Sequence, residues 1–82
     1  MKVKIYGRTT GCKFCDTAKA VCENNKFDME FIDIVTAGID GAKLSELCGE
    51  PVRQVPQIFV NDVYVPGGCA GFVEGLKEGR WN

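Results

Sequence analysis

The residues best suited to carry out chemistry in this chain are two closely spaced cysteines, in the segment Cys12-Lys13-Phe14-Cys15. Two thiols at this spacing can form a disulfide, and either becomes a nucleophile when it loses its proton. The chain has five cysteines and no histidine. This composition excludes hydrolases that activate a nucleophile with histidine, and metal sites that need an imidazole ligand. The other three cysteines stand alone, so the pair is the main indication of function.

The pair lies where a helix is expected to begin. Apolar residues at helical spacing predict a helix over residues 14–24, after a loop over 7–11 that contains two glycines. The unpaired N–H groups of the first turn, and the positive end of the helix dipole, then face the Cys12 sulfur and favour its thiolate. Cysteines in such pairs have pKa values of roughly 3.5–7, against about 8.5 for an ordinary cysteine. Cys15 is expected to be less exposed.

A zinc site and inert core thiols are the alternatives to a redox pair. Structural zinc needs four ligands, which usually come from two such pairs, and a second pair is missing here. Cys22 and Cys48 fall on apolar helical faces and are predicted to be core residues. Cys69 is expected to pack as well, although it lies at a predicted helix start. A Cys-x-x-Cys pair in a short strand–helix–strand unit favours a thioredoxin-like redox motif.

The elements that must position the pair are expected in the order β-α-β-α-β-β-α. Strands are predicted at 2–6, 29–35, 57–60 and 63–65, and helices at 14–24, around 44–48 and at 70–78. Ile34 and Val35 are expected to be buried in the second strand. The first strand–helix–strand unit predicts parallel strands, and the connection Asn61-Asp62 predicts a hairpin. The predicted fold class is α/β, a four-stranded mixed sheet flanked by three helices.

Length and charge restrict the classes of function. The 82 residues are predicted to form a single domain over residues 1–82. Ten basic and eleven acidic residues leave a net charge of −1, so neither nucleic acid nor a membrane is expected as a partner. No apolar run approaches the roughly 18–20 residues needed to span a bilayer, and no signal-peptide pattern opens the chain. A cytoplasmic location is therefore expected.

Several segments together make the chain resemble a glutaredoxin. The matching pieces, in family order and spacing, are Ile5-Tyr6-Gly7-Arg8, Gly11-Cys12-Lys13-Phe14-Cys15, Val55-Pro56-Gln57-Ile58-Phe59-Val60 and Gly67-Gly68. The resemblance covers nearly the whole chain and is greatest to the small dithiol glutaredoxins of bacteria and their phages. It implies a thioredoxin fold and glutathione-dependent reduction of protein disulfides and glutathione mixed disulfides. Cys12 would be the nucleophile and Cys15 the resolving thiol.

The resemblance also implies glutathione as co-substrate, no metal, and a monomer that acts on disulfide-containing proteins such as ribonucleotide reductase. Arg8 and Arg53 would attract the glycine carboxylate of glutathione, and Phe14 stands where the family usually has a tyrosine. The residues expected to bind glutathione are Arg8, Lys13, Phe14, Arg53, Gln54, Val55, Pro56, Gly68, Cys69 and Ala70.

Backbone groups are expected to provide much of the glutathione site. The Val55-Pro56 bond, which would be expected to be trans if the proline stood alone, is cis on this resemblance. Val55 would then pair its backbone with the cysteinyl part of glutathione, as an added strand does. The N–H groups of Cys69 and Ala70 would receive the γ-glutamyl carboxylate at a helix N-terminus. Glutathionylation of the Cys69 thiol is the alternative to its packing in the core.

The chain departs from the glutaredoxin pattern in four places. In chain order, these are an additional residue between Gly7 and Cys12, Lys13-Phe14 in place of a common Pro-Tyr, Gln54 in place of a common threonine, and Ala70-Gly71 where an aspartate is common. The last departure removes a partner for the γ-glutamyl ammonium. A lost hydrogen bond to a charged group costs at most about 1.5–3 kcal/mol, so weaker or altered glutathione recognition is expected.

Two other functions remain open from the sequence. The missing aspartate is compatible with a redoxin that is reduced by a thioredoxin-reductase-type flavoprotein instead of glutathione. A non-enzymatic alternative is an iron–sulfur or metal carrier that uses Cys12 across a dimer. A thioredoxin proper is disfavoured, because Gly11 stands where thioredoxins usually have a tryptophan.

Overall fold

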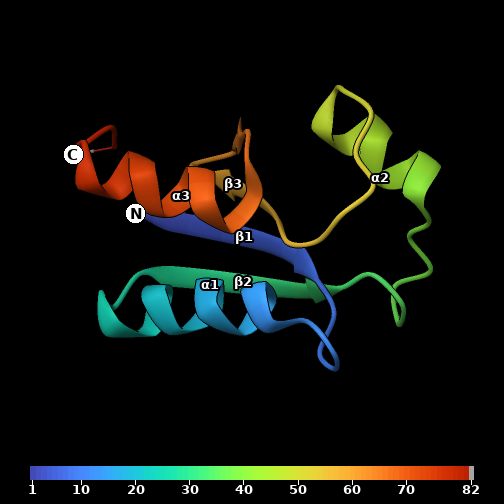
Figure 1. Ribbon diagram of the computed structural model, residues 1–82, viewed down its shortest axis with the longest axis horizontal. Coiled ribbons are helices and arrows are strands. Elements are labelled where there is room, and N and C mark those ends of the chain that lie inside the picture. The colour runs from blue at the N-terminus through green and yellow to red at the C-terminus, as the bar shows by residue number, and fades with distance from the viewer. Residues whose placement is uncertain (82) are drawn as a thin grey trace.

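The described residues form seven elements in the predicted order (Figure 1). The structure is a computed structural model that describes residues 1–81. The strands are β1 (Lys2–Gly7), β2 (Asp28–Asp33), β3 (Gln57–Val60) and β4 (Val63–Val65). The helices are α1 (Lys13–Asn24), α2 (Gly41–Cys48) and α3 (Gly68–Lys77). The predicted domain ends at Asn82, which lies outside the described residues.

The strands form one mixed sheet in the order β2-β1-β3-β4. β1 runs parallel to β2 and antiparallel to β3, and β3 pairs antiparallel with β4. Ile5 on β1 lies opposite Phe31 on β2 and Ile58 on β3. Every second residue of β1 is buried, because successive side chains of a strand point to opposite faces. The predicted mixed sheet and hairpin are therefore confirmed.

α1 and α3 pack side by side on the sheet, whereas α2 lies beyond the ends of β1 and β2 (Figure 1). Asp40 caps α2 by accepting a hydrogen bond from the N–H of Lys43 at 2.8 Å. Gly49 ends it with a φ of 77°, a conformation that favours glycine. The hydroxyl of Ser45 holds the following chain by exchanging two hydrogen bonds with the backbone of Val52. α2 thus positions the loop that leads to β3.

The main core lies between the sheet and the pair α1 and α3. Phe72 of α3 is completely buried, and Cys22 of α1 and Cys69 of α3 are 1% and 7% exposed. Cys48 of α2 is 8% exposed. The prediction that the three isolated cysteines pack inward is confirmed. The buried residues of the main cluster are Val3, Ile5, Ala18, Cys22, Ile58, Val60, Val65, Cys69 and Phe72.

The second strand ends earlier than the sequence predicts. β2 stops at Asp33, and Val35 is 70% exposed although it was expected to be buried. The Asp33 carboxylate accepts a hydrogen bond from the Val35 N–H at 2.9 Å, which turns the chain away from the sheet. Ile34 is buried as expected, because its N–H still pairs with the Gly7 carbonyl at 2.9 Å.

The last helix begins two residues before its predicted start. α3 begins at Gly68, since the Gly71 N–H already donates a helical hydrogen bond to the Gly67 carbonyl at 3.1 Å. Gly67 and Gly68 have φ values of 90° and 61°. Two glycines therefore make the abrupt turn from β4 into α3, and this turn brings the helix N-terminus to the edge of the sheet.

Candidate active site

A disulfide joins Cys12 and Cys15 at the start of α1, with their Cα atoms 5.2 Å apart. Cys12 is the N-cap residue, with extended backbone at φ −126° and ψ 96°, and Cys15 lies within the first turn. The Cys12 side chain is half-buried, whereas Cys15 is fully buried. The predicted difference in exposure is confirmed. Attack from solvent can therefore reach Cys12 but not Cys15.

Backbone N–H groups converge on both sulfurs. The Cys15 N–H donates to the Cys12 Sγ at 3.2 Å, which makes this sulfur the cap of α1. The Arg8 N–H, in the loop after β1, lies 3.5 Å from the Cys15 Sγ. A thiolate on Cys12 would keep its N–H donor and would lie at the positive end of the helix dipole. The geometry thus favours the ionised form of Cys12 after reduction.

The loop before β3 brings backbone groups to the same place. The Val55-Pro56 bond is cis, as the resemblance implies, and the Val55 carbonyl oxygen lies 3.8 Å from the Cys12 Sγ. The Gln57 carboxamide holds this loop from within the sheet, since its Nε2 donates to the Gln54 carbonyl at 2.7 Å. The Tyr64 hydroxyl donates to the Gln57 Oε1, also at 2.7 Å. One buried side chain therefore links β3, β4 and the loop.

Two adjoining grooves lie near the disulfide, and only the smaller one is lined by Cys12. The groove of about 390 Å³ is lined by Arg8, Gly11, Cys12, Lys13, Phe14, Arg53, Gln54 and Val55. The groove of about 530 Å³ runs towards the start of α3 and is lined by Phe14, Glu50, Val52, Arg53, Gln54, Val55, Pro56, Gln57, Tyr64, Pro66, Gly67, Gly68, Cys69 and Ala70. Every residue predicted to bind glutathione thus lines at least one groove.

Sequence reasoning did not single out several groove residues. Glu50, Tyr64 and Gln57 line the larger groove, and Gln57 is only 6% exposed. A polar residue between the buried positions of a strand was the one available signal for Gln57. Nothing in the spacing of Glu50 or Tyr64 indicates that the loop and the hairpin bring them together.

Burial raises the pKa values of a tyrosine and two cysteines at or near the larger groove. Desolvation raises the pKa of Tyr64 to about 12, with added repulsion from Cys48 and Glu50. Desolvation is also the main reason that the pKa values of the Cys48 and Cys69 thiols are raised. These two thiols are therefore protonated at neutral pH and are poor nucleophiles. This contrast leaves the paired cysteines as the reactive groups.

Neither a metal-binding cluster nor a membrane-spanning helix is found in the described residues. Within residues 1–81, no three His, Cys, Asp or Glu side chains come together in a way that could hold a metal ion. None of the helices in that range combines the length and apolar character that crossing a membrane requires.

Cys12, which caps α1, can form or break a disulfide with Cys15 three residues later. This arrangement is suited to thiol–disulfide exchange. The class of protein is therefore a thiol–disulfide oxidoreductase of the thioredoxin fold. The glutaredoxin family model matches residues 3–65. A glutaredoxin of Haemophilus influenzae is 41% identical over 83 aligned residues, which cover 95% of this chain and 93% of that protein. The chain belongs to the glutaredoxin family.

Solved structures of glutaredoxins share the fold. Oxidised Escherichia coli glutaredoxin superposes with a TM-score of 0.80 at 36% identity, over 95% of each chain. A buckwheat glutaredoxin in complex with glutathione superposes with a TM-score of 0.79 over 95% of this chain and 70% of that chain, at 21% identity. The second likeness concerns the fold alone.

Proposed function

We propose that this protein is a glutathione-dependent dithiol oxidoreductase, with Cys12 as the nucleophile and Cys15 as the resolving thiol. The observation that carries the proposal is the cap geometry, in which a half-buried Cys12 Sγ accepts the Cys15 N–H at 3.2 Å beside an open groove. Cys15 is fully buried but lies within bonding reach of Cys12. One thiol is thus placed to meet substrates and the other to meet only its neighbour.

Reduction of a substrate disulfide takes two exchanges. The Cys12 thiolate attacks one substrate sulfur, so that a mixed disulfide forms while the substrate S–S bond breaks and the departing thiolate takes a proton. Cys15 then loses its proton and attacks the Cys12 sulfur. The Cys12–Cys15 disulfide forms, and the second substrate thiol is released. Two electrons have passed from the protein to the substrate. One of the two protons that the substrate gains comes from Cys15 and the other from solvent, because Cys12 reacts as the thiolate.

Glutathione reverses the oxidation in the same manner. One glutathione thiolate attacks the Cys12 sulfur, which releases Cys15 as a thiol and leaves glutathionyl-Cys12. A second glutathione attacks the glutathione sulfur of this intermediate. Glutathione disulfide leaves, and the dithiol is restored. A glutathione mixed disulfide on another protein enters this cycle directly and needs only Cys12.

In this proposal, glutathione binds in the two grooves. The Val55 backbone beside Cys12 would pair with the cysteinyl part, and the N–H groups of Cys69 and Ala70 would receive the γ-glutamyl carboxylate at the start of α3. Arg8 and Arg53 would attract the glycine carboxylate. The remaining predicted contacts, from Lys13, Phe14, Gln54, Pro56 and Gly68, border the same grooves.

Two single substitutions test the assignment of roles. Cys12→Ser should abolish reduction of every disulfide, because no nucleophile remains at the mouth of the groove. Cys15→Ser should keep reduction of a glutathione mixed disulfide and lose reduction of a protein disulfide. Both variants would be assayed with glutathione as reductant. Full turnover by Cys12→Ser would show that the roles are wrongly assigned.

The physiological setting proposed for this activity is the cytoplasm, with the protein acting as a monomer. Ribonucleotide reductase is the proposed protein substrate, because its disulfide must be reduced in each cycle. Reduction of oxidised ribonucleotide reductase by the purified protein with glutathione would support this. A protein that reduces small mixed disulfides but leaves that enzyme oxidised would contradict it.

A second candidate is a redoxin recharged by a thioredoxin-reductase-type flavoprotein. It is favoured by one observation, that the first turn of α3 carries no acidic side chain to meet the glutathione ammonium. Rates of reduction of the Cys12–Cys15 disulfide by glutathione and by the flavoprotein would separate the two. A good rate with the flavoprotein and none with glutathione would favour the second candidate.

A further inference from the structure

The smaller groove, which Cys12 lines, is basic, although the chain as a whole is not. The smaller groove has three cationic side chains in its lining, Arg8, Lys13 and Arg53, and no acidic one. They come from the loop after β1, the first turn of α1 and the loop before β3. The net charge of the whole chain is −1. The fold therefore brings three of the ten basic residues of the chain together in the groove that Cys12 lines.

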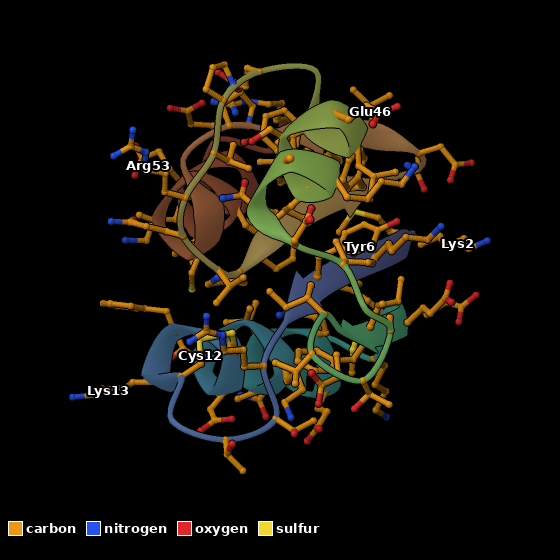
Figure 2. The ribbon with its side chains drawn as sticks, turned by 90° about the vertical axis from the view of Figure 1, so that its right-hand side faces the viewer. Lys2, Tyr6, Cys12, Lys13, Glu46 and Arg53 are labelled. Atoms are coloured by element: carbon orange, nitrogen blue, oxygen red, sulfur yellow. A yellow bond between two sulfur atoms is a disulfide. The ribbon has the colours of Figure 1, made fainter. Side chains whose placement is uncertain are left out.

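These charges are available to a partner. All three side chains are exposed. In residues 1–81 the two ion pairs join Lys19 to Asp16 and Arg80 to Glu78, so the three groove cations have no carboxylate partner. Figure 2 shows Lys13 and Arg53 projecting on the same side of the molecule as Cys12, whereas Lys2 and Glu46 project on the other.

An apolar contact adjoins the basic mouth. Phe14 is 63% exposed and lines both grooves, one residue before the buried Cys15. A polypeptide that presents a disulfide to Cys12 would pass close to Phe14, since both residues line the smaller groove. Its residues next to the reacting cysteine would come near three cationic side chains and one aromatic ring.

We propose that the protein selects protein disulfides whose cysteines are flanked by acidic residues, by drawing them to the cationic rim of Arg8, Lys13 and Arg53. The inference rests on the proposed function and specifies its protein substrate. Opposite charges of this kind raise association rates by roughly 10- to 1,000-fold and lose their effect as salt is added. The chemistry remains the two-electron exchange described above, in which the peptide disulfide is reduced and the Cys12/Cys15 dithiol is oxidised.

The test uses three synthetic peptides that share one internal disulfide and differ only in the residues beside each cysteine: glutamate, glutamine or lysine. The reduced protein is mixed with each peptide, and the second-order rate of peptide reduction is followed by acid quenching and thiol labelling. At low ionic strength we expect the glutamate peptide to react about tenfold or more faster than the lysine peptide. At about 0.5 M salt the ratio should approach one, because the Debye length is then only about 4 Å.

Two charge reversals locate the effect. Lys13→Glu should lower the glutamate-to-lysine rate ratio several-fold, because it reverses one charge of the rim. Lys2→Glu changes the net charge by the same amount on the other side of the molecule and should leave the ratio as in the parent protein (Figure 2). Because the readout is a ratio between peptides, any effect of Lys13 on the reactivity of Cys12 cancels.

The outcomes separate this proposal from the proposed function. Equal rates for the glutamate and lysine peptides, or an equal effect of Lys2→Glu and Lys13→Glu, would overturn the acidic preference while disulfide reduction itself stood. Salt dependence confined to glutathione mixed disulfides would show that the cations serve only the glutathione carboxylates, and would also overturn it. If none of the peptides and no glutathione mixed disulfide were reduced, the proposed function would fail as well.

Discussion

At the scale of single residues, what distinguishes Cys12 from the other cysteines is its environment rather than its type. Cys12 caps a helix and accepts an N–H at 3.2 Å, whereas Cys22, Cys48 and Cys69 are all buried. Burial raises the pKa of each of these three thiols, Cys22 to about 11. After reduction, the helix N-terminus therefore favours the thiolate of Cys12, whereas burial favours the protonated form of the other three thiols.

This difference predicts the order in which the thiols react. In the reduced protein at neutral pH, iodoacetamide should modify Cys12 first, and Cys22, Cys48 and Cys69 only much later. Mass spectrometry of peptides from a time course of quenched samples measures the order. Ultraviolet titration of the thiolate in a variant that keeps only Cys12 should give a pKa below that of free cysteine. Modification of Cys69 as fast as Cys12 would contradict the assignment.

The backbone around Gly71 leaves no room for a side chain at this position. A Cβ at Gly71 would collide with the carbonyl oxygen of Pro66, which is backbone and cannot move aside easily. An aspartate, which the resemblance leads one to expect at position 70 or 71, therefore does not fit at Gly71. Ala70, which is exposed beside the same groove, has no such restriction on its side chain.

Substitution of Gly71 should therefore be costly. Gly71→Ala is expected to lower the free energy of unfolding by about 1–3 kcal/mol, because overpacking outweighs the better helix propensity of alanine. Gly41→Ala is the matched control, since Gly41 also lies in the first turn of a helix and an added Cβ there meets nothing within 4 Å. Urea unfolding measures both. A Gly71→Ala protein as stable as the Gly41→Ala protein would refute the close contact.

At the scale of elements, the buried Gln57 connects the β3–β4 hairpin to the loop that precedes β3. Its carboxamide donates to the Gln54 carbonyl and accepts from the Tyr64 hydroxyl, both at 2.7 Å. Its Oε1 also lies 3.9 Å from the Cys48 Sγ of α2. Because buried polar groups are costly when unpaired, this arrangement fixes the loop relative to the sheet.

Gln57→Leu should affect both stability and substrate binding. It leaves the Gln54 carbonyl and the Tyr64 hydroxyl without these partners, so a loss of about 1–3 kcal/mol in unfolding free energy is expected. KM for a glutathione mixed disulfide should rise several-fold with a smaller change in kcat, because the loop is displaced and Cys12 is untouched. Tyr64→Phe removes one donor and should cost about 1 kcal/mol. An unchanged KM in Gln57→Leu would show that the loop holds its position without Gln57.

The elements were more predictable from the sequence than their ends and their contacts. Alternating and helical apolar patterns predicted all seven elements, because burial on one face dictates those periods. The predicted end of β2 was wrong because the Asp33 carboxylate accepts a hydrogen bond from the Val35 N–H and turns the chain away from the sheet. The apolar periodicity of the sequence does not report this effect. The two cysteines formed a local signal, and the remaining predicted site residues rested on the family resemblance. Glu50 and Tyr64 join the groove through tertiary packing, for which their neighbours in the chain give no signal.

At the scale of the whole molecule, the packing of α1 against α3 makes the stability of the fold depend on pH in the alkaline range. Cys22 of α1 is buried in this core, and desolvation raises its pKa from an ordinary 9.0 to about 11, helped by the nearby Cys69 and Glu23. Below pH 9 the thiol is protonated in both the folded and the unfolded chain. Between pH 9 and 11 only the unfolded chain releases the proton, which favours unfolding.

The stability of the reduced protein should therefore fall as the pH rises from about 9 to 11. The contribution of Cys22 is at most about 3 kcal/mol, because each tenfold difference in acidity corresponds to about 1.36 kcal/mol. Urea unfolding at a series of pH values, with a reductant present, measures the slope. In Cys22→Ala the slope over this range should be shallower by up to one proton, since the other titratable groups are the same in both proteins. Equal slopes in the two proteins would mean that the folded core admits the Cys22 thiolate, and that α1 and α3 pack less tightly around it than the structure shows.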